Sequence, residues 1–467
     1  MLNALNHIDA QNTALEARFR PKLKVNPRLS RQLVSFQANK DIPGYRWYRY
    51  KEGFSEALIQ YILDTLHLDS GTLLDPFAGT GTTLFASAHQ GLHATGIELL
   101  PIGSEVIAVR ELASKTPLEG LIVSLRRWRD DKPWLLTDAL TPFPHLNITK
   151  NAFSPKTETE LSQYLTTAQT QSSDIARLLR FAALCVLEDI SYTRKDGQYL
   201  RWDYRSGRRQ GTTPFDKGRV YSFQDAITQK LDEIITDLSP TRFLPGLFDA
   251  PVESGEIKLL RGSCLEILPT LATASFDGLI TSPPYANRYD YTRTYALELA
   301  LLGVGEEEIR ALRQTMVSCT VENKEKEGLE RHFSPMIYQK AQAAFEGQAE
   351  LHGILGYLEA QKAAKTLNNP GIPRMVRNYF FELALVIFDC ARLLKPGAPF
   401  VMVNDNVRYG GANIPVDLIL SDIAEQAGLE VEVIWVLPTG KGNSSQQMGA
   451  HGREELRKCV YVWRRKE

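Results

Sequence analysis

The segment Asp75-Pro-Phe-Ala-Gly-Thr-Gly-Thr-Thr83 sets the architecture expected of this chain. It follows residues 72–75, which have the apolar character of a short buried strand, and it runs into residues 82–90, which read as a helix. Ala94-Thr-Gly-Ile-Glu98 then predicts a second short strand that ends in a carboxylate. This order of strand, glycine-rich turn, helix and strand indicates a β-α-β unit and the start of a parallel, doubly wound sheet.

The glycine-rich turn has the residues needed to cradle a nucleotide-like ligand. Gly79 and Gly81 carry no Cβ, so the backbone can approach a ligand closely. Asp75 and Glu98 each end a strand, and an acid in the position of Glu98 is suited to accept both hydroxyls of a ribose. The third glycine of G-x-G-x-x-G is missing and no Gly-Lys-Ser/Thr follows, which disfavours a dinucleotide dehydrogenase and a P-loop ATPase.

The sheet pattern continues along the chain but is interrupted twice. Further strands are expected at 257–260, 275–281, 399–403, 430–436 and 459–463, and helices at 53–66, 379–394 and 416–427. We therefore predict an α/β fold with a doubly wound, mostly parallel Rossmann-like sheet, a late antiparallel strand and two largely helical insertions. The expected segments are a basic N-terminal arm at 1–44, core segments at 45–107, 256–301 and 376–467, and insertions at 108–255 and 302–375.

A second informative stretch, Thr281-Ser-Pro-Pro-Tyr285, follows the strand expected at 275–281. Its two prolines fix the loop shape, Ser282 offers a hydroxyl, and the Pro283 carbonyl offers an acceptor. The exocyclic amine of a nucleobase is a poor nucleophile, because its lone pair is delocalised into the ring. Acceptors for both amino hydrogens would aim that lone pair at an electrophile, while the Tyr285 ring could stack on an extruded base. The structural alternative is a Pro-Pro turn that only ends a strand.

The two stretches together resemble motifs I and IV of the amino-methylating DNA methyltransferases, which move a methyl group from S-adenosylmethionine to the exocyclic nitrogen of cytosine or adenine. Ser282 and its three neighbours match the catalytic motif, so the resemblance implies catalytic roles for Ser282, Pro283, Pro284 and Tyr285. It also places cofactor contacts on motifs X, I, II and III, namely Phe54, Ser55, Asp75, Pro76, Phe77, Gly79, Gly81, Thr82, Glu98, Ser263 and Cys264. Ser263 stands where the family usually has an aspartate.

Ser282, which is the first residue of motif IV, indicates which base is methylated. In this family, enzymes with a serine at this position more often methylate the N4 amine of cytosine. Enzymes with an aspartate there usually methylate the N6 amine of adenine. The resemblance therefore implies a site-specific enzyme that forms N4-methylcytosine in double-stranded DNA by base flipping, as the modification partner of a restriction endonuclease. The alternatives are an adenine-N6 methylase on the same scaffold, an RNA base methylase and a nucleic-acid binder without activity.

The net charge is −1 and the pI is about 6.7, so the overall charge does not favour DNA binding. Any DNA contact would therefore be made by local basic patches. One patch spans residues 18–51, and a second at 192–209 interleaves basic and aromatic residues, as a groove for nucleic acid requires. The candidate DNA contacts are Arg194, Lys195, Arg201, Trp202, Arg205, Arg208 and, in the polar loop 438–445, Lys441. For that loop, closure over the base, a phosphate contact and a plain surface role stay open.

Composition sets the remaining limits. The chain is 43% hydrophobic and 23% charged, as in globular proteins, and has no apolar run long enough for a membrane span. Its N-terminus lacks a basic start followed by an apolar stretch, so a cytoplasmic protein is expected. The five cysteines are far apart and form no C-x-x-C pair, so no metal site is expected.

Overall fold

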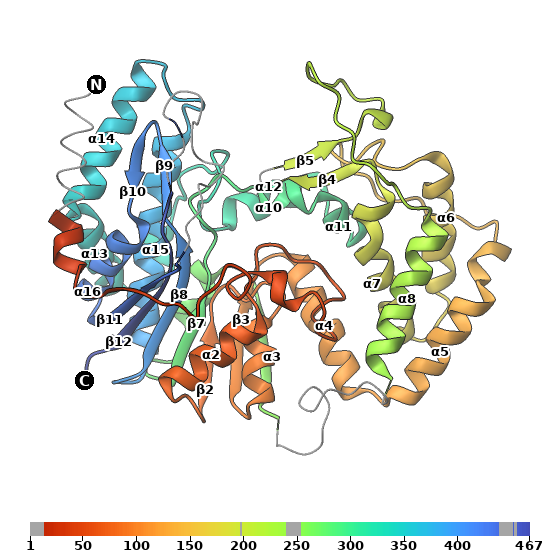
Figure 1. Cartoon of the computed structure of the whole chain (residues 1–467), viewed down its shortest axis with the longest axis horizontal. Coiled ribbons are helices and arrows are strands. Elements are labelled where there is room, and N and C mark those ends of the chain that lie inside the picture. Colours follow the sequence, from red (N-terminus) through yellow and green to blue (C-terminus); the bar gives the residue numbers. More distant parts are fainter. Residues whose placement is uncertain (1–13, 197–198, 240–253, 439–451, 453–454) are drawn as a thin grey trace.

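The computed structural model describes residues 14–196, 199–239, 254–438, 452 and 455–467. At its centre is an eight-stranded sheet with the order β1-β11-β12-β8-β7-β2-β3-β6 (Figure 1). The strands are β1 (Leu23–Val25), β2 (Thr72–Asp75), β3 (His93–Glu98), β6 (Ile257–Arg261), β7 (Gly278–Thr281), β8 (Pro399–Asp405), β11 (Leu429–Val436) and β12 (Lys458–Arg465). β12 is antiparallel to both of its neighbours, and the other pairs are parallel. The predicted mostly parallel sheet with a late antiparallel strand is confirmed.

The strand order reverses at β2. From β2 the sheet continues through β3 to β6 on one side and through β7 to β8 on the other. Asp75 ends β2 and Thr281 ends the adjacent β7, so the two informative stretches meet at the same edge of the sheet. Ligands of open α/β sheets bind outside the carboxyl ends of the strands at such a reversal.

Alternating apolar side chains bury both faces of the sheet. Leu73 and Val401 belong to a hydrophobic cluster with α2, whereas their neighbours Leu74 and Phe400 belong to a larger cluster with α15 and α16. Parallel strands buried on both faces explain the continuous apolar runs in the sequence. The helices of the two layers are α2 (Glu56–Leu66), α3 (Thr82–His89), α9 (Cys264–Ile267), α13 (Pro335–Glu346), α14 (Ala349–Ala363), α15 (Ile372–Leu393) and α16 (Val416–Gln426).

The first insertion builds a helical lobe beside the sheet (Figure 1). Its hydrophobic core is separate from those of the sheet and contains stacked and edge-on rings of Trp128, Trp134 and Tyr164. The lobe is made of α4 (Pro101–Lys115), α5 (Leu118–Asp131), α6 (Pro155–Ala168), α7 (Ser173–Ile190), α8 (Phe223–Leu238) and the short helices η2 (Pro133–Leu136) and η3 (Tyr204–Ser206). An antiparallel pair, β4 (Thr193–Asp196) and β5 (Tyr199–Trp202), projects from it.

The second insertion does not form a lobe of its own. α13 packs on α15, and Phe345 and Ile354 of α13 and α14 lie in the same hydrophobic cluster as the sheet. The remaining elements are α10 (Tyr291–Thr294), α11 (Ala296–Leu301), α12 (Glu306–Thr315), β9 (Val407–Tyr409), β10 (Ala412–Ile414), η1 (Phe36–Asn39), η5 (Leu268–Thr270) and η6 (Leu329–Arg331).

The N-terminal arm contributes to the fold in a way that its basic composition did not suggest. β1 pairs with β11 and adds an edge strand to the sheet. Arg18 forms ion pairs with Asp422 and Glu425, and Lys22 lies 3.9 Å from Glu430. These basic side chains therefore face acids on α16 and β11.

Candidate active site

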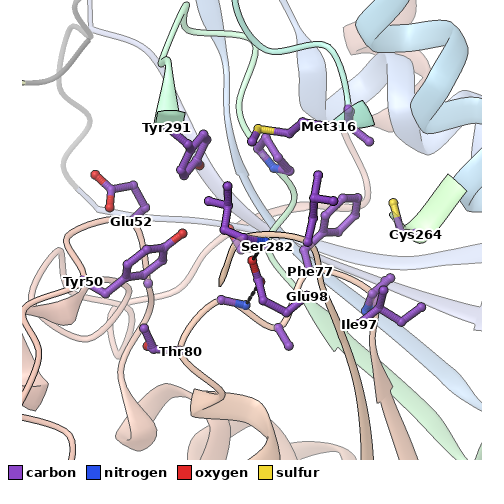
Figure 2. Close-up of a pocket in the computed structure, with 18 of the residues that line it drawn as sticks. Tyr50, Glu52, Phe77, Thr80, Ile97, Glu98, Cys264, Ser282, Tyr291 and Met316 are labelled. Carbon is purple, nitrogen blue, oxygen red and sulfur yellow. Dashed lines mark hydrogen bonds between the residues drawn. The ribbon is translucent and has the colours of Figure 1, made fainter. Parts of the chain in front are cut away.

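A cavity lies at the carboxyl ends of β2, β3 and β7, where ligands of open α/β sheets bind. Figure 2 shows residues that line it, from the sheet and from loops on either side. The lining residues that the sequence predicted are Phe54, Pro76, Phe77, Gly79, Thr82, Glu98, Ser263, Cys264, Ser282 and Pro284.

The glycine-rich turn forms the floor of this cavity. Gly79 and Gly81 have φ angles of +55° and +79°, a region that side chains with a Cβ rarely adopt. A Cβ on Gly79 would stand 3.3 Å from the Tyr50 ring, and one on Gly81 would stand 2.7 Å from Ile107. Gly79 therefore keeps the cavity open, whereas Gly81 caps α3 and is required for packing.

Glu98 is buried at the end of β3 and faces the cavity. One carboxylate oxygen accepts the backbone N–H of Gly79 at 2.7 Å, and the other accepts that of Leu100 at 2.7 Å. Burial raises the pKa of Glu98 to about 8, although these backbone donors oppose the rise. Each oxygen keeps a further lone pair, so the carboxylate can accept two ligand hydroxyls.

Asp75, in contrast, does not line the cavity. Its Oδ1 accepts the Thr281 hydroxyl at 2.6 Å and the Phe77 N–H at 3.0 Å, and its Oδ2 accepts the Thr83 hydroxyl at 2.7 Å. Burial raises the pKa of Asp75 to about 6, against these three donors. The side chain joins the cofactor turn to the Ser-Pro-Pro-Tyr loop and is buried, 1% exposed, outside the cavity lining.

The segment before α2 contributes Tyr50, Glu52, Gly53 and Phe54 to the cavity. Ser55 has a different function, because its hydroxyl accepts the Leu58 N–H at 3.2 Å as the N-cap of α2 and donates to the Leu33 carbonyl. Such a cap stabilises a helix by about 1 kcal/mol. Ser55 therefore positions Phe54 rather than lining the cavity itself.

The opposite wall comes partly from residues that no sequence motif pointed to. Tyr291, Met316 and Val317 line the cavity, together with the aliphatic Ile97. The loop carrying Met316 is fixed from behind, where the Glu382 carboxylate accepts the backbone N–H and the hydroxyl of Ser318 at 2.7 Å each. The Ser263 hydroxyl donates to the Thr315 carbonyl at 3.1 Å and so holds the same loop.

The Ser-Pro-Pro-Tyr loop closes the cavity on the β7 side. The Ser282 hydroxyl lies 3.1 Å from the Val403 carbonyl and 3.2 Å from the Tyr285 hydroxyl, while Pro283 is buried. The Lys458 ammonium lies 5.5 Å from the Tyr285 ring centroid and 3.2 Å from Asp405, its register partner across β12 and β8. Burial lowers the pKa of Lys458, but Asp405 and Tyr285 together raise it above its usual value, so the ammonium stays charged.

The basic and aromatic segment divides into exposed and internal side chains. Arg194 and Arg201 are exposed on β4 and β5, with Arg201 lying 4.0 Å from the Phe215 ring centroid. Lys195 points inward, where its ammonium pairs with the buried Glu298. This corrects the interpretation of Lys195 as a DNA contact, because alternate residues of a strand face opposite sides.

Two further arginines of this segment are engaged within the protein. The Arg205 guanidinium binds both carboxylate oxygens of Asp203, at 2.6 and 2.9 Å. Arg208 lies 3.6 Å from the centroid of the half-buried Trp202 and donates to the carbonyls of Ile148 and Lys150. Lys441, the last predicted DNA contact, lies outside the described residues.

Two further observations concern the described residues as a whole. Within them, no three or more His, Cys, Asp or Glu side chains are grouped so that they could hold a metal ion. None of the helices described here is both long and apolar enough to cross a membrane.

The sheet reversal, the glycine-rich floor and the Ser-Pro-Pro-Tyr loop define the class of the amino-methylating DNA methyltransferases, which use S-adenosylmethionine as methyl donor. In agreement, a profile of the N6/N4 DNA methylase family matches residues 27–105. The chain is 50% identical over 466 residues to the type II methyltransferase M.AvaI of Nostoc sp. (strain PCC 7120), covering 99% of this chain and 94% of that protein.

Two other relatives show the same relationship over nearly their whole length. M.AvaI of Anabaena variabilis is likewise 50% identical over 466 residues, with the same coverage. The type II methyltransferase M.BsoBI of Geobacillus stearothermophilus is 40% identical over 464 residues, covering 93% of this chain and 88% of that protein. The chain therefore belongs to the type II DNA methyltransferases of restriction-modification systems.

Proposed function

We propose that this methyltransferase transfers a methyl group from S-adenosylmethionine to the N4 amine of cytosine at a specific site in double-stranded DNA. The observation that carries the proposal is that motif IV begins with a serine and not an aspartate, and that the Ser282 side chain lines the cofactor cavity. An aspartate at this position would offer only acceptors when ionised, whereas the serine presents a single neutral oxygen.

The hydrogen bonds of Ser282 favour a role as acceptor. A backbone carbonyl can only accept, so the bond to Val403 at 3.1 Å uses the single hydroxyl hydrogen of Ser282. The Tyr285 hydroxyl, at 3.2 Å, can donate to the same oxygen. A lone pair of Ser282 then remains for one amino hydrogen of the target base, and the Pro283 carbonyl is the proposed acceptor for the other. The two contacts would draw the nitrogen towards tetrahedral geometry, which strengthens them in the transition state.

The target base would reach this site by leaving the DNA stack. Extrusion costs a few kcal/mol, and stacking on an aromatic ring returns about 1–3 kcal/mol per base. Tyr285 is the proposed ring, and the Lys458 ammonium lies 5.5 Å from its centroid. The pairing of Lys458 with Asp405 fixes the cation under the ring.

The cavity fits the methyl donor by the chemistry of its walls. Glu98 is placed to accept the ribose hydroxyls, and the apolar Phe77, Ile97 and Met316 would enclose the adenine. S-adenosylmethionine supplies an electrophilic methyl group when bound. Ser282 and Pro284 line the same cavity, so the proposed amine acceptor borders the donor site directly.

DNA is proposed to lie along the exposed side of β4 and β5. Arg194, Arg201, Tyr199 and Tyr204 are exposed there, which combines phosphate-binding cations with rings able to stack. β5 packs against α10, which follows the Ser-Pro-Pro-Tyr loop closely in the sequence, so bound DNA would be close to the site. A cognate restriction endonuclease is the proposed functional partner.

The proposal can be tested by supplying labelled S-adenosylmethionine with unmethylated double-stranded DNA, single-stranded DNA or RNA. Label is expected in double-stranded DNA, and the modified DNA should resist the cognate endonuclease. Transfer to RNA in preference to DNA would contradict the proposal and support the RNA alternative. Ser282→Ala is the matched control, because it preserves the cavity and removes only the hydroxyl.

A further inference from the structure

Arg288 comes three residues after Tyr285, the last residue of the Ser-Pro-Pro-Tyr loop, and has a backbone conformation that arginine rarely adopts. Its φ angle is +68°, in the left-handed region where a residue with a Cβ is strained. Other residues with positive φ, such as His67 and Lys132, cap the ends of helices, where this conformation is common. Arg288 lies between β7 and α10 and ends no helix. Strained backbone of this kind occurs most often at functional sites.

The hydrogen bonds of the Arg288 guanidinium leave it able to bind an anion. Within the part of the chain that the structure describes, its partner is the neutral side-chain oxygen of Asn368, at 3.3 Å, and its Nε–H is buried without a partner. A buried donor without a partner is costly, so an added acceptor would stabilise this side chain. A guanidinium can donate two parallel hydrogen bonds to one phosphate, which makes arginine well suited to that ligand.

The Arg288 side chain lies near β9, on the sheet side of the molecule. The Tyr409 hydroxyl of β9 donates to the Ala286 carbonyl at 2.7 Å. Burial raises the pKa of Tyr409, and the charge of Arg288 opposes the rise, as expected of a cation close to this hydroxyl. The proposed DNA contacts on β4 and β5 belong instead to the helical lobe (Figure 1). Arg288 is therefore a cation beside the Ser-Pro-Pro-Tyr loop that the DNA surface proposed above does not include.

Extrusion of the target base would bring phosphates to this loop. The nucleotide turns about the DNA backbone, so the phosphates on either side of it lie close to the site that receives the base. Three residues span at most about 11 Å, and the Asn287 N–H donates to the Tyr285 carbonyl at 2.8 Å, which shortens the path from Tyr285 to Arg288. We propose that Arg288 binds a phosphate that flanks the extruded nucleotide. The proposal rests on base extrusion at Tyr285, which is part of the proposed function, and does not depend on which base is methylated.

Duplexes in which one phosphate is replaced by an uncharged methylphosphonate test this assignment without turnover. The replaced phosphate is the one on the 5′ or the 3′ side of the target base, which is first mapped in modified DNA whichever base carries the methyl group. DNA affinity is measured with protein saturated with S-adenosylhomocysteine, so the chemical step does not contribute.

One of the two replacements is expected to weaken binding to the unaltered protein by about 10- to 100-fold, the range for a lost charge-assisted hydrogen bond. The same replacement should change the affinity of Arg288→Asn by less than about twofold, because the phosphate contact is already absent. Equal losses in the two proteins, or no loss with either replacement, would overturn the proposal.

Arg288→Asn also separates phosphate binding from a structural role. Asparagine accepts the left-handed conformation more readily than arginine, so the thermal midpoint should be equal to or above that of the unaltered protein. The affinity for unmodified DNA should fall by about 10- to 100-fold, and the slope of log affinity against log salt should fall by about 0.9. A lower midpoint with unchanged DNA affinity would mean that Arg288 only stabilises the fold.

Asn368→Ala is the matched control, because it removes the hydrogen-bond partner of Arg288 and keeps the cation. Its DNA affinity should stay within about twofold of that of the unaltered protein. If Asn368→Ala reproduced the loss seen in Arg288→Asn, Arg288 would act by holding the exposed Asn368 in place, and the phosphate contact would be excluded.

Discussion

The hydroxyl of Thr281 donates to Asp75 at 2.6 Å, across 206 positions of the sequence. Asp75 ends β2 and begins the glycine-rich turn, and Thr281 ends β7 and begins the Ser-Pro-Pro-Tyr loop. Both residues are buried. The bond therefore fixes the position of the proposed amine acceptor relative to the floor of the cofactor cavity.

Replacing Thr281 by Val should lower the free energy of unfolding by about 1–3 kcal/mol, because the buried Asp75 carboxylate loses one of its donors. Thr281→Ser keeps the hydroxyl and is the matched control, expected to lose less. Urea denaturation at neutral pH measures both. Equal losses in the two variants would mean that the hydrogen bond contributes nothing beyond packing.

Ligand affinity should depend on pH through Glu98. Its pKa is raised to about 8 by burial, and the ionised form is the better acceptor for ribose hydroxyls, so affinity should rise as pH increases towards 8 and then level off. The slope cannot exceed about tenfold per pH unit for one proton. 5′-Methylthioadenosine is the ligand to use, since it has no amino group that titrates in this range. Glu98→Gln should remove the dependence, and a flat profile in the unaltered protein would contradict the assignment.

Substitutions of Ser282 and Tyr285 should affect different steps of the reaction. Ser282→Ala is expected to lower the single-turnover rate of methyl transfer by about 10²- to 10³-fold with little change in DNA or cofactor affinity, because its contact strengthens in the transition state. Rapid-quench measurement with enzyme in excess gives this rate. A Ser282→Ala enzyme with full rate would exclude the hydroxyl from the chemistry.

Tyr285→Ala should weaken both base capture and turnover, because about 1–3 kcal/mol of stacking is lost. Tyr285→Phe keeps the ring and removes only the hydroxyl, which lies 3.2 Å from Ser282, so it should retain most of the binding. Equilibrium DNA titration together with single-turnover kinetics separates the two variants. Identical behaviour of Phe and Ala would argue against stacking.

The exposed arginines of β4 and β5 should carry phosphate contacts. The double variant Arg194→Ala and Arg201→Ala should lower DNA affinity and reduce the slope of log affinity against log salt by about 0.9 for each lost contact. Cofactor affinity should not change. Arg127→Ala, at an exposed arginine of α5, is the control. An unchanged slope in the double variant would mean that this surface does not contact DNA.

Substitution of Arg205 should lower stability and leave the salt dependence of DNA binding unchanged. Its guanidinium binds the buried Asp203 through two hydrogen bonds and also donates to the Gly218 carbonyl, so Arg205→Ala should lower the thermal stability of the lobe. Differential scanning calorimetry measures this effect. If Arg205→Ala is as stable as the unaltered protein but its DNA affinity depends less on salt, Arg205 contacts DNA.

The fold could be predicted because its signals are local. Apolar strands, a turn that needs glycine at positive φ and helices with apolar faces each leave a pattern within a few residues, and the order of β2, α3 and β3 followed from it. β1 could not be predicted in the same way. It has three residues, and its pairing with β11 depends on residues that are distant in the sequence.

The site was predictable only where a motif marks it. A strand-end acid indicates an edge of the sheet but not the direction of its side chain, so Asp75 and Glu98 were treated alike although only Glu98 faces the cavity. Met316 was missed because tertiary packing, and not a motif, brings it to the cavity. Lys195 could have been separated from Arg194 by the two-residue period of a strand.

The identity of the methylated base tests the proposed function most directly. The purified protein would be incubated with S-adenosylmethionine and unmethylated double-stranded DNA, and the DNA digested to nucleosides for mass spectrometry. The serine at position 282, in place of an aspartate, leads us to expect N4-methylcytosine. N6-methyladenine as the product would contradict that interpretation of Ser282.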